Sequence, residues 1–249
     1  METLEAPAKQ ATIAPKMKTP TTQAKATKET TTKIAEAETQ TALLTQMKSA
    51  LEENIYQEIY PNRKRITRTM CQLLEDNGLL NEKFELIDGE IILKMPVNPP
   101  HRIALILLRN WLVFVFGSLF AQTENPLDLT GAEGEITQPQ PDAAVTLAPA
   151  TSYTESNPGP QDVSLVVEIS NTTLRYDLTT KALLYARSGI PEYWVMDVND
   201  RCLHRHRQPT ATGYEDIVIL REMESVSPLN RAESTLISEL LPAPRPVME

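Results

Sequence analysis

Hydrophobic and polar positions along the chain predict a series of helices and strands that begins at about residue 64. Short apolar runs between turn residues indicate strands, and longer apolar patterns closed by Gly indicate helices. The expected elements are, in order, a helix at 64–77, a hairpin at 83–94, a helix at 102–120, strands at 121–129, 141–147 and 163–170, a helix at 176–188, and strands at 192–197, 202–207 and 216–220. This order favours an α/β fold in which helices flank a mixed sheet over a regular, doubly wound one.

Turn residues mark several of these boundaries. Gly78 follows the first helical pattern and can adopt the left-handed conformation that often ends a helix. Asp88-Gly89 lies between two short apolar runs, which is the strongest short-range signal of a β-hairpin. Gly189 closes the helix expected at 176–188, and a Pro- and Ser-rich composition predicts a loop at 148–161.

The two ends of the chain differ in composition from the part between them. Residues 1–42 are rich in Thr, Lys, Ala, Gln and Glu and contain no aromatic residue, so they bury too little apolar surface to offset the entropy of ordering. We therefore expect a disordered tail at 1–42, a folded domain at 60–225 and a C-terminal extension at 226–249. The extension is Pro-rich, and one short helix is expected within it at 232–240.

The net charge of the chain is −9, and it resides in the body of the protein. The tail contains six Lys and five Glu, so the remaining residues carry about ten net negative charges. Affinity for phosphate groups comes mainly from Lys and Arg, and an acidic body therefore argues against a large groove for tight duplex binding. A small local basic site remains compatible with this charge.

Cysteine usage and one long apolar run bear on where the protein works. Cys71 and Cys202 lie far apart without metal-type spacing, which favours a reducing, cytoplasmic setting.

The apolar run 103–121 approaches the ~20 residues that span a bilayer. Arg109 lies near its middle and costs ~2.5–3.5 kcal/mol on insertion scales, so a soluble helix is favoured over a membrane span. Because this helix is apolar on nearly all sides, we expect part of it to be buried in a homodimer.

Glu168 stands out because it lies inside the apolar strand expected at 163–170. Burying a carboxylate is costly unless the group is paired, protonated or bound to a metal ion. If strands 141–147 and 163–170 are antiparallel neighbours in the simplest register, Asp142 faces Glu168, at ~4.5–5.5 Å between Cβ atoms. Two carboxylates at that distance repel each other unless a cation lies between them, and oxygen ligands favour Mg²⁺ or Mn²⁺ over Zn²⁺.

Three polar residues of the helix that follows repeat at intervals of four. Asp177, Lys181 and Tyr185 therefore share one helix face. An N-terminal Asp that favours the helix dipole and an Asp–Lys ion pair would account for the first two without any function. Beside a pair of carboxylates, however, Lys181 could polarise a water molecule or neutralise charge that develops on a phosphate.

These residues together resemble the Uma2 family of restriction endonuclease-like proteins, within the PD-(D/E)XK nuclease superfamily. The resemblance covers roughly residues 68–220. It is carried by "FELIDGEII" at 84–92, His101 at the start of the following helix, "QPDAAV" at 140–145, "VVEIS" at 166–170 and, most specifically, "DLTTKALLYARSGIPEYWVMD" at 177–197.

The family resemblance implies a fold and a set of roles. The fold is the restriction-endonuclease-like αβββαβ core, and the activity is metal-dependent hydrolysis of nucleic acid, with DNA as the expected substrate. Asp142, Glu168 and the backbone carbonyl of Ile169 would hold Mg²⁺ or Mn²⁺. Glu85 matches an acid near that site, which could be a further ligand of the ion or support one of its ligands. Members of the superfamily usually have a Lys two residues after the second acid, and in this chain that position is Ser170. In Uma2-like sequences the Lys lies on the following helix, and Lys181 matches that position.

Other interpretations remain open at this point. A family member without catalytic activity that acts as a binding or assembly module is the main alternative, and a membrane-associated protein is a third. His101 is interpreted as a helix-start or core residue, while His204 and His206 are interpreted as part of a solvated edge strand rather than a metal pair. Trp194 is expected in the core.

Overall fold

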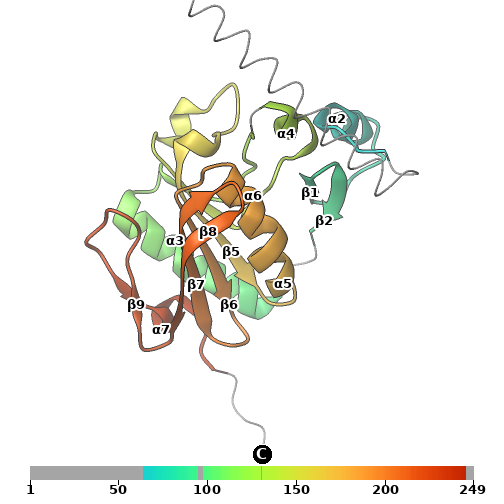
Figure 1. Cartoon of the computed structure of the whole chain (residues 1–249). Helices are drawn as coiled ribbons and strands as arrows, with labels where there is room; N and C mark the ends of the chain where they lie inside the picture. Colours follow the sequence, from blue (N-terminus) through green and yellow to red (C-terminus); the bar gives the residue numbers. More distant parts are fainter. Residues whose placement is uncertain (1–63, 95–97, 130, 245–249) are drawn as a thin grey trace, which may run out of the picture. The chain divides into compact units, whose positions relative to one another are not determined.

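The computed structural model describes residues 64–94, 98–129 and 131–244. The disordered tail expected at 1–42 lies outside these residues. The central feature is a six-stranded sheet with the strand order β3-β4-β5-β6-β7-β8, in which only the β5–β6 pair is parallel among the described strands (Figure 1). Its strands are β3 Ala121–Thr123, β4 Ala143–Thr146, β5 Val163–Ser170, β6 Glu192–Asp197, β7 Cys202–Thr210 and β8 Gly213–Arg221.

The predicted register of β4 against β5 is confirmed. Ala143 faces Val167 and Val145 faces Leu165 in the antiparallel ladder, and the same register brings Asp142, just before β4, opposite Glu168. The ladder shifts by one residue only beyond Val145, on the far side from Asp142. Because side chains alternate between faces, Asp142 and Glu168 lie on the same face of the sheet.

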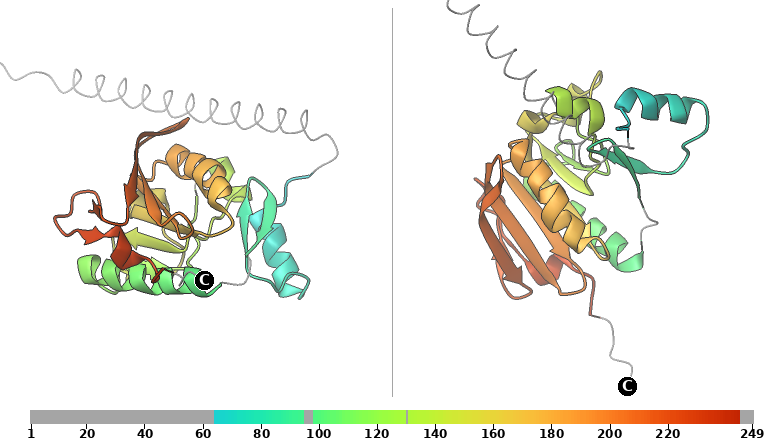
Figure 2. Two further views of the ribbon diagram at one scale, coloured as in Figure 1. Left: turned by 90° about the horizontal axis from the view of Figure 1, so that it is seen from below. Right: turned by 45° about the vertical axis from the view of Figure 1, so that its right-hand side comes forward.

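Helices cover both faces of the sheet (Figure 2). Helix α3, Pro99–Phe116, packs on one face together with the short α7, Ile237–Leu240. The other face is covered by a helical segment made of α5, Leu174–Tyr176, the π-helical turn η3, Asp177–Lys181, and α6, Ala182–Arg187. The predicted class, an α/β fold with a mixed sheet flanked by helices, is confirmed.

Helix α3 begins three residues earlier than its apolar pattern suggested, because Asn98 caps it. The Asn98 side chain accepts a hydrogen bond from the His101 backbone N–H, and two Pro residues occupy the first helical positions. The helix ends at Gly117, whose φ of 93° suits glycine. Ala104, Leu108 and Leu112 form the face that packs on the sheet. Among the described residues, no helix combines the length and apolar character needed to cross a membrane.

A smaller substructure precedes α3. Helix α2, Arg68–Asp76, follows the cap residue Thr67, so it begins later than the helix predicted at 64–77. The predicted hairpin is present, with β1, Phe84–Ile87, antiparallel to β2, Glu90–Leu93. Asp88 and Gly89 both have positive φ, as a two-residue hairpin turn requires.

Two further predicted elements differ from the structure, and three short helical elements were not predicted. The strand expected at 121–129 ends at Thr123, since Glu124 takes a positive φ and Pro126 follows. The helix α4, Gly131–Ile136, and the 3₁₀ turns η1, Ala150–Ser152, and η2, Pro160–Asp162, were not predicted. In the C-terminal extension, the helix expected at 232–240 is reduced to α7, because β10, Thr235–Leu236, pairs with β9, Ser225–Val226.

Candidate active site

Glu168 lies in the middle of the sheet and is paired with two side chains of the covering helical segment. It is 3% exposed. Its Oε1 atom accepts hydrogen bonds from Lys181 Nζ and from the Tyr185 hydroxyl, both at 2.9 Å. Burial raises the pKa of Glu168 to about 8, and the nearby acids Asp142, Asp177 and Glu85 add to this against the opposing charge of Lys181. The carboxyl group therefore takes up a proton far more readily than an exposed Glu.

Lys181 connects two acidic residues that come from different parts of the chain. Its Nζ atom lies 2.9 Å from Glu168 Oε1 and 2.9 Å from Glu85 Oε1 of strand β1. Burial alone would lower the pKa of Lys181, but Glu168, Glu85 and Asp177 outweigh it and raise that pKa above its ordinary value. Lys181 is therefore a buried ammonium ion that joins the hairpin to the sheet.

Asp142 is held by one backbone group and faces two basic side chains. Its Oδ2 atom accepts a hydrogen bond of 2.7 Å from the backbone N–H of Ile169, the residue after Glu168. Its Oδ1 atom lies 3.4 Å from His101 Nε2 and 4.0 Å from Lys94 Nζ. Burial would raise the pKa of Asp142, but His101, Lys94 and the Ile169 N–H together hold it below its usual range. Asp142 therefore remains a carboxylate at neutral pH.

The helical segment that supplies Lys181 contains a π-helical turn, which the sequence pattern did not predict. The Ala182 backbone N–H donates to Asp177 O, five residues back, in place of the usual four. Lys181 and Tyr185 both reach Glu168 from this segment. Asp177 instead accepts hydrogen bonds from the hydroxyls of Ser170, at 2.5 Å, and Thr173, at 2.6 Å. The three residues predicted to share one helix face therefore belong to two separate groups: Lys181 and Tyr185 bind Glu168, whereas Asp177 binds the two hydroxyls.

The structure brings together the four side chains that the sequence predicts near one site: Lys181 is ion-paired with Glu85 and Glu168, and Asp142 lies opposite Glu168 in the β4–β5 register. Lys94 was not identified as a neighbour of this site from the sequence, and His101 was interpreted as a helix-start or core residue. His101 does lie in the first turn of α3, where Asn98 caps the helix, but its ring also reaches Asp142. The feature of the sequence that could have identified Lys94 and His101 is the short spacing between the end of the hairpin and the capped start of α3.

The interpretation of His204 and His206 as an edge strand was wrong. Strand β7 lies between β6 and β8, so it is internal. His206 is buried, and its ring packs against Tyr193 and Tyr214. Trp194 is in the core, as expected, and donates a hydrogen bond from its ring nitrogen to Glu192.

The donor atoms of the site fit a hard divalent cation. Both hydrogen bonds to Glu168 reach the Oε1 atom, so the second carboxylate oxygen remains to bind an ion. With Asp142 opposite and the Ile169 backbone alongside, the group offers carboxylate and carbonyl oxygens, which are the ligands that Mg²⁺ and Mn²⁺ prefer. The two carboxyl groups also repel each other, which a cation between them would relieve.

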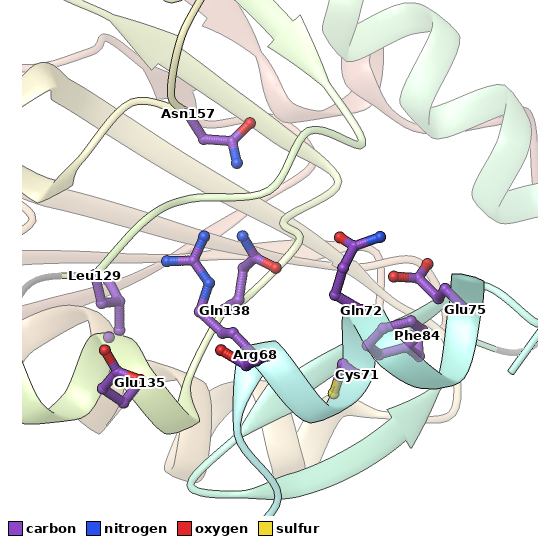
Figure 3. Close-up of a pocket in the computed structure, with 11 residues that line it drawn as sticks. Arg68, Cys71, Gln72, Glu75, Phe84, Leu129, Glu135, Gln138 and Asn157 are labelled. Carbon is purple, nitrogen blue, oxygen red and sulfur yellow. The ribbon is translucent and has the colours of Figure 1, made fainter. Parts of the chain in front are cut away.

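A polar hollow of about 630 Å³ lies elsewhere, between α2, β1 and the segment around α4 (Figure 3). Arg68 and Gln138 lie side by side in it and both bind Asp128, at 2.9 and 2.8 Å. Phe84 lines it, and because neighbouring strand residues point to opposite faces, Glu85 points away from it. The hollow is therefore separate from the carboxylate group.

Comparisons with known proteins agree with this architecture. The model of the Uma2 family, described as "Putative restriction endonuclease", matches residues 73–237. Among solved structures, the chain is similar to a protein from Anabaena variabilis ATCC 29413 that is described as a "putative nuclease belonging to DUF820". That match has 16% sequence identity and a TM-score of 0.50, and it covers 67% of this chain and 96% of the other. The comparison with curated proteins gave no match.

Proposed function

Since this chain belongs to the Uma2 family, we propose that it is a Mg²⁺- or Mn²⁺-dependent endonuclease that hydrolyses phosphodiester bonds of nucleic acid, with DNA as the substrate. The observation that carries the proposal is the grouping of Asp142 and Glu168 across the β4–β5 ladder with Lys181 in contact with Glu168. Two facing acids can hold a divalent ion that assists phosphoryl hydrolysis, and a lysine beside them can stabilise the charge that develops on the phosphate. The family supports nuclease activity, and the donor atoms support the choice of ion.

Asp142, Glu168 and the Ile169 carbonyl are the proposed ligands of the ion. A bound divalent ion supplies a Lewis acid for a phosphate oxygen and lowers the pKa of water. The Ile169 N–H and His101 hold Asp142 in position for this role. Glu85 serves the site through Lys181, because its Oε1 atom binds the ammonium group and its Oε2 atom accepts a hydrogen bond from the Gln140 backbone N–H at 3.2 Å.

Lys181 is the proposed catalytic cation. A protonated lysine has three N–H donors, and Glu85 and Glu168 use two of them. The third remains to contact a phosphate oxygen or the attacking water. A fixed positive charge in a poorly hydrated site stabilises developing negative charge strongly, because little solvent reorganisation is needed. Tyr185 supports this arrangement by binding the same Glu168 oxygen.

The experiment that tests the function is a cleavage assay on single-stranded, duplex and branched DNA and on RNA, with Mg²⁺, with Mn²⁺ and with a chelator. We expect metal-dependent cleavage of DNA that is lost in Asp142→Asn and Glu168→Gln. Asp216→Asn serves as the control, because Asp216 is a carboxylate of β8 that pairs with Arg205 outside the site. Cleavage that persists in both site variants, or that does not need a metal ion, would contradict the proposal.

A catalytically silent module is the second candidate, and one observation favours it. Lys181 is 3% exposed and already paired with two carboxylates, which limits its access to a substrate. In that case Mg²⁺ would still bind at Asp142 and Glu168, but no substrate of the panel would be cut. Measuring metal binding and cleavage on the same samples separates the two candidates.

The proposed setting is reducing and cytoplasmic, and the proposed assembly is a homodimer. Cys71 and Cys202 are both free thiols, as a reducing compartment favours. Helix α3 supports the dimer, because Ile106 and Phe114 are exposed on its outer side.

A further inference from the structure

Three potential metal ligands meet where the β6–β7 turn joins the sheet. Asp197 ends β6, Cys202 begins β7 and His204 follows two residues later. One ligand atom from each residue, a carboxylate oxygen, Sγ and a ring nitrogen, lies within 4.8 Å of the others. None of the three belongs to the proposed nuclease site, and the proposed function gives them no role.

The strand geometry explains why these side chains converge. Asp197 and Cys202 are direct partners in the antiparallel β6–β7 ladder. Cys202 and His204 are two residues apart on one strand, so their side chains point to the same face of the sheet. A ligand triangle on adjacent strands is rigid, because the backbone hydrogen bonds of the ladder hold all three positions.

The separation of sulfur and nitrogen matches a tetrahedral metal centre. Cys202 Sγ lies 3.7 Å from His204 Nε2. Bond lengths of ~2.3 Å from zinc to sulfur and ~2.05 Å to nitrogen, at a tetrahedral angle, place these atoms about 3.6 Å apart. We propose that Asp197, Cys202 and His204 form a second metal site that binds Zn²⁺ or a similar transition-metal ion.

The third ligand and the protonation states fit this assignment. The Asn199 and Asp200 backbone N–H groups both donate to Asp197 Oδ1, at 2.9 and 3.0 Å, so they fix the carboxylate while Oδ2 remains to bind an ion. Burial lowers the pKa of His204, which keeps its imidazole neutral at pH 7. Burial raises the pKa of Cys202, so its thiol proton must leave as the ion binds.

The two proposed metal sites differ in chemistry. Asp142 and Glu168 offer only oxygen and suit Mg²⁺, whereas thiolate and imidazole select transition metals such as zinc. Three protein ligands leave a fourth tetrahedral position for water or an exogenous group. His204 is partly exposed, which gives an ion a route to the site. A bound ion would also link the end of β6 to the start of β7 and so stabilise the turn between them.

The test uses the full-length chain and Co²⁺ as a spectroscopic substitute for Zn²⁺. We expect stoichiometric Co²⁺ binding with a thiolate-to-cobalt charge-transfer band and the intense visible bands of tetrahedral cobalt. Zn²⁺ should remove these bands by competition, while Mg²⁺ in excess should not. Zn²⁺ should also raise the Tm of the protein.

Single variants locate the site, and the second cysteine gives a matched control. Cys202→Ser should remove the charge-transfer band, and His204→Gln should weaken Co²⁺ binding and alter the visible bands. Cys71→Ser should retain both signals, because Cys71 is also a buried thiol but lies in α2. Asp142→Asn should also retain them, so the result is independent of nuclease activity. Absence of the charge-transfer band in the wild type, or its survival in Cys202→Ser, would overturn the proposal.

Discussion

The ammonium group of Lys181 lies 2.9 Å from Glu168 Oε1, although the two residues are 13 positions apart in the chain. The position two residues after Glu168 holds Ser170, whose hydroxyl binds Asp177 instead. The lysine therefore approaches the strand from the helical segment above it. Its position depends on the π-helical turn and on Glu85 of the hairpin as well as on the sheet.

Lys181→Ala is expected to destabilise the protein as well as abolish turnover. The substitution leaves Glu85 and Glu168 buried without their shared cation, and breaking a buried pair in this way costs about 3–5 kcal/mol. Urea denaturation without metal should show this loss. Lys83→Ala is the matched control, because Lys83 is exposed and forms a longer contact of 3.6 Å with Glu124. A Lys181→Ala protein that cleaves DNA at the wild-type rate would contradict the proposed role of this lysine.

Adding Mg²⁺ should stabilise the wild-type fold through Asp142 and Glu168. An ion that binds only the folded state contributes about 2.7 kcal/mol at a concentration 100 times its Kd. Asp142→Asn and Glu168→Gln should each remove this metal-dependent rise in Tm. In the absence of metal, Glu168→Gln should be no less stable than the wild type, since it removes a charge that burial and neighbouring acids disfavour. The Gln side-chain oxygen can still accept the hydrogen bond from Lys181, which also keeps Glu85 as its counter-ion. Differential scanning calorimetry with and without Mg²⁺ measures both effects.

Phe114→Asp should weaken the proposed homodimer without disturbing the fold of the monomer. Phe114 is 79% exposed, so the change removes no core contact, whereas a charge in an apolar interface is strongly unfavourable. Met223→Asp is the matched control, because Met223 is 81% exposed and lies between β8 and β9. Light scattering at micromolar concentration should show a dimer for the wild type and the control, and a monomer for Phe114→Asp. A monomeric wild type would rule out the assembly.

The core of the candidate site could be predicted from the sequence because two regular geometries determine it. The simplest register of the antiparallel β4–β5 pair, assumed from the sequence, places Asp142 opposite Glu168. Helical spacing places Lys181 and Tyr185 on one side of their helix. The apolar strand 163–170 was predicted with its observed boundaries, since its burial on both faces gives a continuous apolar run.

The remaining features depend on contacts that have no local pattern. The Asp177 side chain turns toward Ser170 and Thr173, and the adjacent π-helical turn carries no signature in the spacing of apolar residues. His101 reaches Asp142 only through the tertiary packing of α3. The two cysteines have no metal-type spacing in the sequence, and Asp197 comes to lie beside Cys202 and His204 only through the pairing of β6 with β7.

The stability of the metal-free protein should fall as pH rises through the range in which Glu168 loses its proton. Burial raises the pKa of Glu168 from 4.5 to about 8, so between these values the folded state holds a proton that the unfolded state has released. The contribution of Glu168 to the free energy of unfolding is therefore fully present below about pH 4.5 and is lost as pH rises through about 8. Glu168→Gln carries no titrating proton at this position, so the difference in unfolding free energy between variant and wild type should grow with pH. Urea denaturation of both proteins without metal, at intervals from about pH 5 to about pH 9, measures this difference. A constant difference across that range would show that Glu168 is already a carboxylate at acidic pH, held in that form by Lys181.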